Sequence, residues 1–144
     1  MSGPLEIPKL FTVDEANQLL PLLELLIKEL SLKKREIEDK QVEVDAVEII
    51  MDEETPKLHA ELEARALELN ELVNQFNEIG KKIEDQGCLV KDIDQGLVDF
   101  FGRYEGEVVF FCWRLGEPRV AHWHEVGSGF ANRKPLEAES KDHV

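Results

Sequence analysis

Apolar residues recur at helical spacing over two long stretches of the chain. The first stripe, in which Lys34 and Gln41 are polar interruptions, consists of Ala16, Leu20, Leu23, Ile27, Leu30, Ile37 and Val44. The second consists of Leu62, Ala66, Leu69, Val73, Phe76, Gly80 and Ile83. This periodicity predicts a long antiparallel helical hairpin, coiled-coil-like, over residues 11–86. The interruptions predict weaker burial in the second half of the first helix.

Local signals mark the helix ends. Thr12 and Glu15 have the spacing of a capping box, in which each side chain bonds a free backbone amide of the first turn. Thr55 followed by Pro56 predicts the start of the second helix after an acidic break. Pro21 lies inside the first stripe and lacks an amide hydrogen, so we expect a kink or a division into two helices there.

After Gly87 the pattern changes to strand-like runs rich in Val, Phe and Trp, separated by glycine-containing turns. Strands are expected over residues 88–91, 97–103, 107–113 and 119–126. They predict a small antiparallel β-meander of three or four strands within residues 87–136, followed by a disordered tail over residues 137–144. The predicted fold is therefore a single α+β domain over residues 1–144.

Charge and composition narrow the functional classes. The chain has 31 acidic and 17 basic side chains, a formal net charge of -14, which disfavours nucleic acid and anionic membranes as partners. Its start lacks the basic and apolar regions of a secretory signal, so we expect a cytoplasmic protein with free thiols. Two amphipathic stripes alone make a thin core, so we also expect a homodimer.

Three runs resemble a prokaryotic family known as domain of unknown function 2203. They begin at Val90, Phe111 and Trp123, and the helix start at Phe11 is also similar. The resemblance covers most of the chain but implies no activity. It implies family motif positions at Asp99, Cys112, Trp113, Gly116, Glu117, Trp123, His124, Gly129 and Arg133.

Residue types capable of metal or thiol chemistry gather in the β-rich segment. They are Asp99, Cys112, His122, His124 and Glu125. If Glu105 and Gly106 form a two-residue turn, Asp99 lies opposite Cys112 and both share one face of the sheet. The two histidines, separated by two positions, share a face with each other whatever the pairing of their strand.

The next hairpin leaves two alternatives. A two- or four-residue loop around Gly116 places both histidines on the face away from Cys112. An odd loop, such as a three-residue loop that pairs Cys112 with His122, places them beside Asp99 and Cys112. The second arrangement predicts a site in which Cys112 and His124 bind zinc or iron. His122, Asp99 or Glu125 would complete the set of ligands.

Other interpretations compete with the metal site. Cys112 and the neighbouring aromatic residues are also typical of a packed core, and each histidine is also typical of the surface or of a hydrogen-bonded position in the core. A thiol enzyme would use Cys112 as nucleophile, His124 as base and Asp99 to orient the base. The apolar run around Cys112 disfavours it. Arg103 and Arg133 either anchor a carboxylate or pair with acidic side chains.

The sequence therefore supports two hypotheses about function. It does not decide whether the protein is an enzyme. The first is a cytosolic protein that binds a transition metal through its β-rich segment. The second is a non-catalytic interaction or dimerisation module built on the helical hairpin. Sequence identifies neither a substrate nor a catalytic residue.

Overall fold

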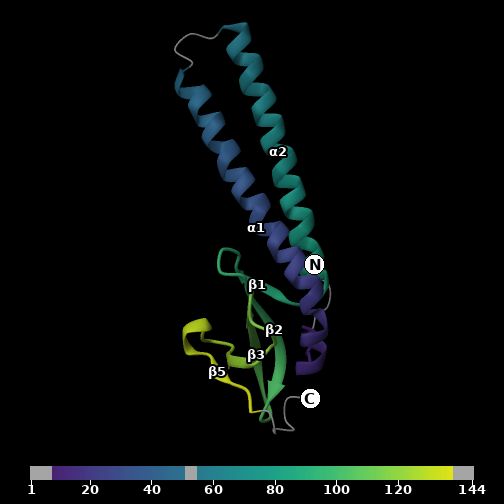
Figure 1. Ribbon diagram of the computed structural model, residues 1–144. Helices are drawn as coiled ribbons and strands as arrows, with labels where there is room; N and C mark the ends of the chain where they lie inside the picture. Colours follow the sequence, from purple (N-terminus) through teal and green to yellow (C-terminus); the bar gives the residue numbers. More distant parts are fainter. Residues whose placement is uncertain (1–7, 51–54, 138–144) are drawn as a thin grey trace, which may run out of the picture. The chain divides into compact units, whose positions relative to one another are not determined.

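The computed structural model describes residues 8–50 and 55–137. These contain two helices, α1 (Val13–Ile50) and α2 (Pro56–Asp85), and then a five-stranded antiparallel sheet (Figure 1). The strands are β1 (Leu89–Asp92), β2 (Leu97–Tyr104), β3 (Glu107–Arg114), β4 (His122–Glu125) and β5 (Lys134–Pro135), with a 3-10 helix η1 (Phe130–Asn132) before the last. The predicted α+β class, a helical hairpin followed by an antiparallel sheet, is confirmed.

The predicted helix starts are also present. The Thr12 amide donates to Glu15 Oε1 at 2.8 Å, and the Glu15 amide donates to Thr12 Oγ1 at 3.0 Å, which completes the capping box. Thr55 Oγ1 accepts from the Leu58 amide at 3.2 Å and caps α2. The acidic break before Thr55, and the predicted tail beyond residue 137, lie outside the described residues.

The predicted division of the first helix at Pro21 is wrong, because α1 runs through this proline. Pro21 is exposed, whereas Leu20 and Leu23 on either side are buried. Burial of these two apolar side chains stabilises the helix here and offsets the roughly 3 kcal/mol that an interior proline costs. The burial of neighbouring apolar side chains therefore outweighs the tendency of Pro21 to end the helix.

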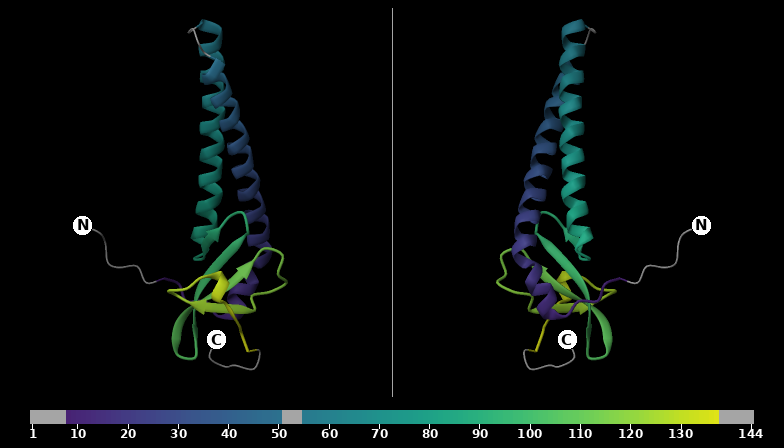
Figure 2. Two further views of the ribbon diagram at one scale, coloured as in Figure 1. Left: turned by 90° about the vertical axis from the view of Figure 1, so that its left-hand side faces the viewer. Right: turned by 90° about the vertical axis from the view of Figure 1, so that its right-hand side faces the viewer.

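By contact density the chain forms two compact units, one of residues 28–81 and one that combines the residues up to 27 with those from 82 onward. In the first unit α1 and α2 lie side by side and antiparallel (Figures 1 and 2). Val44 and Val47 are buried there, while Ile37, between the polar interruptions, is half-buried. Ala66 is exposed, so the stripe of α2 is narrower than predicted.

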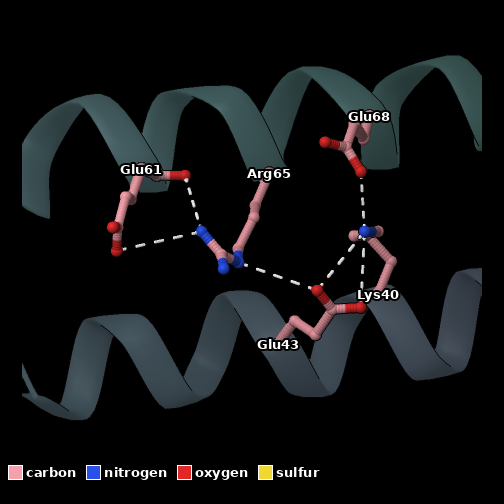
Figure 3. Close-up of polar contacts among 5 residues, drawn as sticks. All are labelled: Lys40, Glu43, Glu61, Arg65 and Glu68. Atoms are coloured by element: carbon pink, nitrogen blue, oxygen red, sulfur yellow. Dashed lines mark hydrogen bonds and ion pairs between the residues drawn. The ribbon is translucent and has the colours of Figure 1, made fainter.

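Ion pairs connect the two helices of this unit (Figure 3). Lys40 Nζ of α1 lies 2.7 Å from Glu68 Oε2 of α2, and Arg65 Nε of α2 lies 3.6 Å from Glu43 Oε1 of α1. Lys40 also pairs with Glu43 on its own helix at 3.3 Å, and Arg65 with Glu61 at 4.0 Å. Lys40 and Arg65 are therefore each placed between a carboxylate of α1 and a carboxylate of α2.

In the second unit the strands follow one another in the order β1-β2-β3-β4-β5. Glu105 and Gly106 join β2 to β3 with φ angles of 52° and 81°, as a two-residue hairpin turn with positive φ at both positions requires. Asp99 lies opposite Cys112, as this turn predicts. The fifth strand is an addition to the predicted meander and pairs with β4.

The β3–β4 pairing is the alternative that brings the histidines to the face of Cys112. Cys112 pairs with His122 and Phe110 with His124. The connection is odd but longer than the three residues considered, because it spans residues 115–121. Within it, the Val120 amide donates to Asn17 Oδ1 of α1 at 2.7 Å, a contact between residues 103 positions apart.

The two faces of the sheet have different surroundings. On one face, Phe100 meets Phe11 edge to face at 5.2 Å, and the Phe11 amide donates to the Phe101 carbonyl at 2.7 Å, which joins the segment before α1 to β2. The other face carries Asp99 and Cys112. The chain between β4 and β5 lies beside that second face, and Asp99 and His124 there are buried.

Candidate metal centre

Three strands contribute one chemically active side chain each to the enclosed face of the sheet. Asp99 comes from β2, Cys112 from β3 and His124 from β4, and all three are buried. One ligand atom of each lies within 4.8 Å of the other two. Asp99 and His124 meet across β3, where His124 Nε2 lies 2.9 Å from Asp99 Oδ2.

The hydrogen bonds of His124 fix the state of its ring. Nδ1 lies 2.8 Å from the Glu125 carbonyl oxygen, which only accepts, so Nδ1 carries a proton and donates it. Nε2 lies 2.9 Å from Asp99 Oδ2. One proton therefore lies between Nε2 and the carboxylate. When it leaves, Nε2 presents its lone pair, while the carbonyl bond keeps the ring in the orientation typical of metal-binding histidines.

Burial controls the protonation of the other two groups. It raises the pKa of the Asp99 carboxyl, and the charge and hydrogen bond of His124 only partly oppose this. Burial, with the nearby Asp99 carboxylate, raises the pKa of the Cys112 thiol to about 12, although Arg133 lowers it through a hydrogen bond and its charge. Without a metal ion bound to it, Cys112 is therefore a neutral thiol at physiological pH.

Arg133 links this cluster to a second pair. Its guanidinium binds both oxygens of Glu117, at 3.0 and 2.6 Å, and lies 4.2 Å from the centroid of the Phe130 ring. Burial raises the pKa of Glu117, but the hydrogen bonds from Arg133 and the Arg114 amide outweigh it and hold that pKa below its ordinary value. The pairing interpretation of Arg133 is thus the one found, while Arg103 is exposed.

The separations of the cluster are close to those that a metal ion needs. With bonds of 2.0 to 2.3 Å, tetrahedral ligands lie roughly 3.3 to 3.8 Å apart. The Asp99–His124 pair at 2.9 Å must open slightly, and the widest separation, at most 4.8 Å, must close by about 1 Å.

The model of a family described as uncharacterised conserved proteins, DUF2203, matches residues 9–136. The chain belongs to the DUF2203 family. A search of the curated proteins and a search of the solved structures found no significant match to this chain. In addition, no helix among the described residues is long and apolar enough to cross a membrane.

Five of the positions that the resemblance implied lie in this cluster or in the ion pair beside it. Asp99, Cys112 and His124 form it, and Glu117 and Arg133 form the pair beside it. Sequence reasoning from residue types alone missed Glu117. The resemblance, which included this residue, was the signal that could have found it, because a surface glutamate in a turn is otherwise unremarkable.

Two of the ligands predicted from the sequence lie outside the cluster. His122 is opposite Cys112, but burial and the charge of Arg133 lower its pKa, and within the described residues its buried Nδ1 has no hydrogen-bond partner. The Glu125 side chain is exposed and lies 3.7 Å from Lys134 Nζ. Glu125 contributes its backbone carbonyl instead, which orients His124.

The geometry disfavours the thiol enzyme. A cysteine nucleophile needs a base that accepts its proton and a depressed pKa. Here both nitrogens of His124 are bonded elsewhere, one to a carbonyl and one to Asp99, and the pKa of Cys112 is raised. What Asp99, Cys112 and His124 share is a set of N, S and O donor atoms that point to one place.

Proposed function

We propose that this protein binds one transition-metal ion through Asp99 Oδ, Cys112 Sγ and His124 Nε2. The observation that carries the proposal is the convergence of these three buried donor atoms within 4.8 Å of one another. The carbonyl of Glu125 supports it, because it holds Nδ1 and directs Nε2 toward the other two donors.

The donor set selects the kind of metal. A thiolate and an imidazole favour zinc or iron(II) over magnesium and calcium, which prefer oxygen ligands only. A bound divalent cation also reverses the local electrostatics, since it stabilises the Cys112 thiolate that burial disfavours. Zinc or iron(II) is therefore the proposed ion.

Elemental analysis and zinc titration of the purified protein test this proposal. Wild type should contain or bind about one metal ion per chain, whereas Cys112→Ser and His124→Gln should weaken binding at least about tenfold, the lower end for loss of even an outer-shell partner. Absence of stoichiometric metal, or equal binding by these two variants and wild type, would contradict the proposal.

The chain offers a matched control for each variant. Cys88→Ser changes the other cysteine, which is also buried but bonds the Ile83 carbonyl, and should leave metal binding unchanged. His122→Gln changes the neighbouring histidine of the same strand. Because His122 lies outside the cluster, this variant should retain the metal and thereby distinguish the two histidines.

Exposed apolar residues support a second candidate function, in which residues 28–81 bind a second copy of the chain. Their large exposed apolar side chains, each at least 50% accessible, are Leu32, Val42, Ile49, Ile50 and Leu67. Val42 and Ile49 are one heptad apart on α1, so they lie on the same side of the helix. Such a stripe would be covered in a homodimer.

Sedimentation of wild type and of Val42→Lys with Ile49→Lys tests the dimer. We expect wild type to sediment as a dimer and the double variant as a monomer with unchanged helix content. Glu38→Gln with Asp45→Asn, at exposed acidic positions of the same helix, changes the net charge by the same two units and should remain dimeric if only the apolar stripe matters. A monomeric wild type would contradict this candidate.

A further inference from the structure

A small cavity adjoins the proposed metal site. Its volume is about 100 Å³, and all three proposed ligands lie on its wall. The rest of its lining comes from β1, from the start of β2 and from the chain between β4 and β5: Lys91, Leu97, Ser128, Gly129 and Phe130. A metal held by Asp99, Cys112 and His124 would therefore face this cavity with its remaining coordination position.

The cavity volume limits what can bind there. A water molecule occupies about 30 Å³ in the liquid, so the space corresponds to about three waters or one molecule of a few non-hydrogen atoms. Leu97 and Phe130 make part of its wall apolar. The hydroxyl of Ser128 already donates to the Glu125 carbonyl at 3.1 Å, so it offers a ligand no free proton.

The charges around the cavity select the sign of that molecule. The Asp99 carboxylate and the Cys112 thiolate together neutralise a divalent ion, and His124 as a ligand is neutral. Lys91 is the remaining charged residue of the lining that the structure describes, and its Nζ lies 4.7 Å from the centroid of the Phe110 ring. Arg133 is neutralised by Glu117. One positive charge therefore remains uncompensated.

We infer that this cavity binds a small monoanion the size of acetate, with one oxygen on the metal and its charge offset by Lys91. The inference rests on the proposed metal site and adds its ligand class. Three protein ligands with a fourth, exchangeable position are the arrangement of catalytic rather than structural metal sites. The cavity thus provides the place where a small carboxylate substrate or product would bind.

Cobalt(II)-loaded full-length protein provides the test, because its visible absorption responds to the ligands of the ion. Acetate should change the spectrum in a saturable manner. Acetamide, which has the same shape without the charge, should not, and benzoate, which is too large for the cavity, should not. If acetate leaves the spectrum of the cobalt(II)-loaded protein unchanged, or if acetamide changes it equally, the inference is overturned.

Variants of Lys91 identify the source of the charge selectivity. Lys91→Gln should weaken acetate binding about fivefold, the upper end for a partly exposed ion pair. Lys91→Arg should restore it, and Lys57→Gln, at an exposed position of α2, should leave it unchanged. Equal acetate affinity in Lys91→Gln and wild type overturns the role of Lys91.

The outcomes separate this inference from the proposal beneath it. If cobalt binds stoichiometrically but acetate has no effect, only the cavity inference fails. If cobalt does not bind at all, the metal site and the cavity inference fail together, and this is seen before any anion is added.

Discussion

Gly102 is the position where the packing of the sheet excludes a side chain most directly. A Cβ atom there would lie 2.1 Å from the ring of Phe111, which is fully buried. Gly102→Ala should therefore lower the free energy of unfolding by about 1 to 3 kcal/mol, because the ring or the strand must move. Chemical denaturation monitored by circular dichroism measures this loss.

Gly127→Ala is the matched control for this substitution. A Cβ at Gly127 meets no atom within 4 Å, so the change in unfolding free energy should stay within about 0.5 kcal/mol. Equal denaturation midpoints for the two variants would show that the contact with Phe111 does not limit position 102.

Cys88 makes the stability of the protein depend on alkaline pH. Burial raises the pKa of this thiol to about 11, from an ordinary value near 9.0. The unfolded thiol therefore loses its proton first, so the stabilisation is complete below about pH 9 and is lost as pH rises toward 11. In that window the titration of Cys88 alone should lower the unfolding free energy by about 1.4 kcal/mol per pH unit.

Urea denaturation at several pH values, in wild type and in Cys88→Ala, checks this expectation. Cys112 and all other titratable side chains are present in both proteins, so the difference between their slopes isolates Cys88. Parallel pH profiles would contradict the assignment of a raised pKa to this thiol.

At the scale of elements, the ion pairs between the two helices of residues 28–81 stabilise their antiparallel alignment. Lys40 lies between Glu68 and Glu43, and these two glutamates hold the pKa of Lys40 above its ordinary value (Figure 3). Glu68→Lys should lower the melting temperature at low salt, because it places like charges opposite each other, and Lys40→Glu combined with it should restore part of the loss.

Thermal melts at low and high salt measure this effect. The difference between single and double variants should shrink at high salt, where exposed charges are screened. A salt-independent difference would show that Lys40 acts through the packing of its hydrocarbon stem instead.

The elements differ in how far local sequence determines them. Both helices and the β2–β3 pairing were predictable, because helix N-caps, heptad stripes and the Glu105–Gly106 turn act over a few residues. The β3–β4 pairing was left open for a physical reason. A seven-residue connection does not impose a register, and here it is held by contacts with distant parts of the chain, such as the bond from the Val120 amide to Asn17.

The candidate site was predictable only in part, because one of its residues comes from β4, whose pairing with β3 local sequence does not determine. Asp99 and Cys112 were predictable neighbours, since one turn relates them. The choice of His124 over His122 was not predictable, because the two share a face and differ only in their surroundings, Asp99 for one and Arg133 with Glu117 for the other. Long-range packing, which periodicity does not encode, makes this distinction.

At the scale of the whole molecule, metal binding should protect one unit and leave the other unchanged. The three proposed ligands lie in β2, β3 and β4, within the unit that contains the sheet. A ligand that binds only the folded state stabilises it by mass action, by about 2.7 kcal/mol at a hundredfold excess over its dissociation constant. Amide exchange in these strands should therefore slow when zinc is added.

Hydrogen-exchange mass spectrometry with and without zinc measures this protection. Peptides from residues 28–81 should exchange at the same rate in both conditions, and Cys112→Ser should abolish the slowing in the strands. Equal protection of both units in wild type would show that the metal acts on the molecule as a whole.

The sheet also carries the two tryptophans of the chain, Trp113 and Trp123, each next to a residue of the cluster in sequence. Indole emission therefore reports on the sheet alone, whereas far-ultraviolet ellipticity is dominated by the helices. A denaturation followed by both signals shows whether the two units lose structure together. A paramagnetic ion such as cobalt(II) at the site would quench this emission, so metal occupancy can be read without any added label.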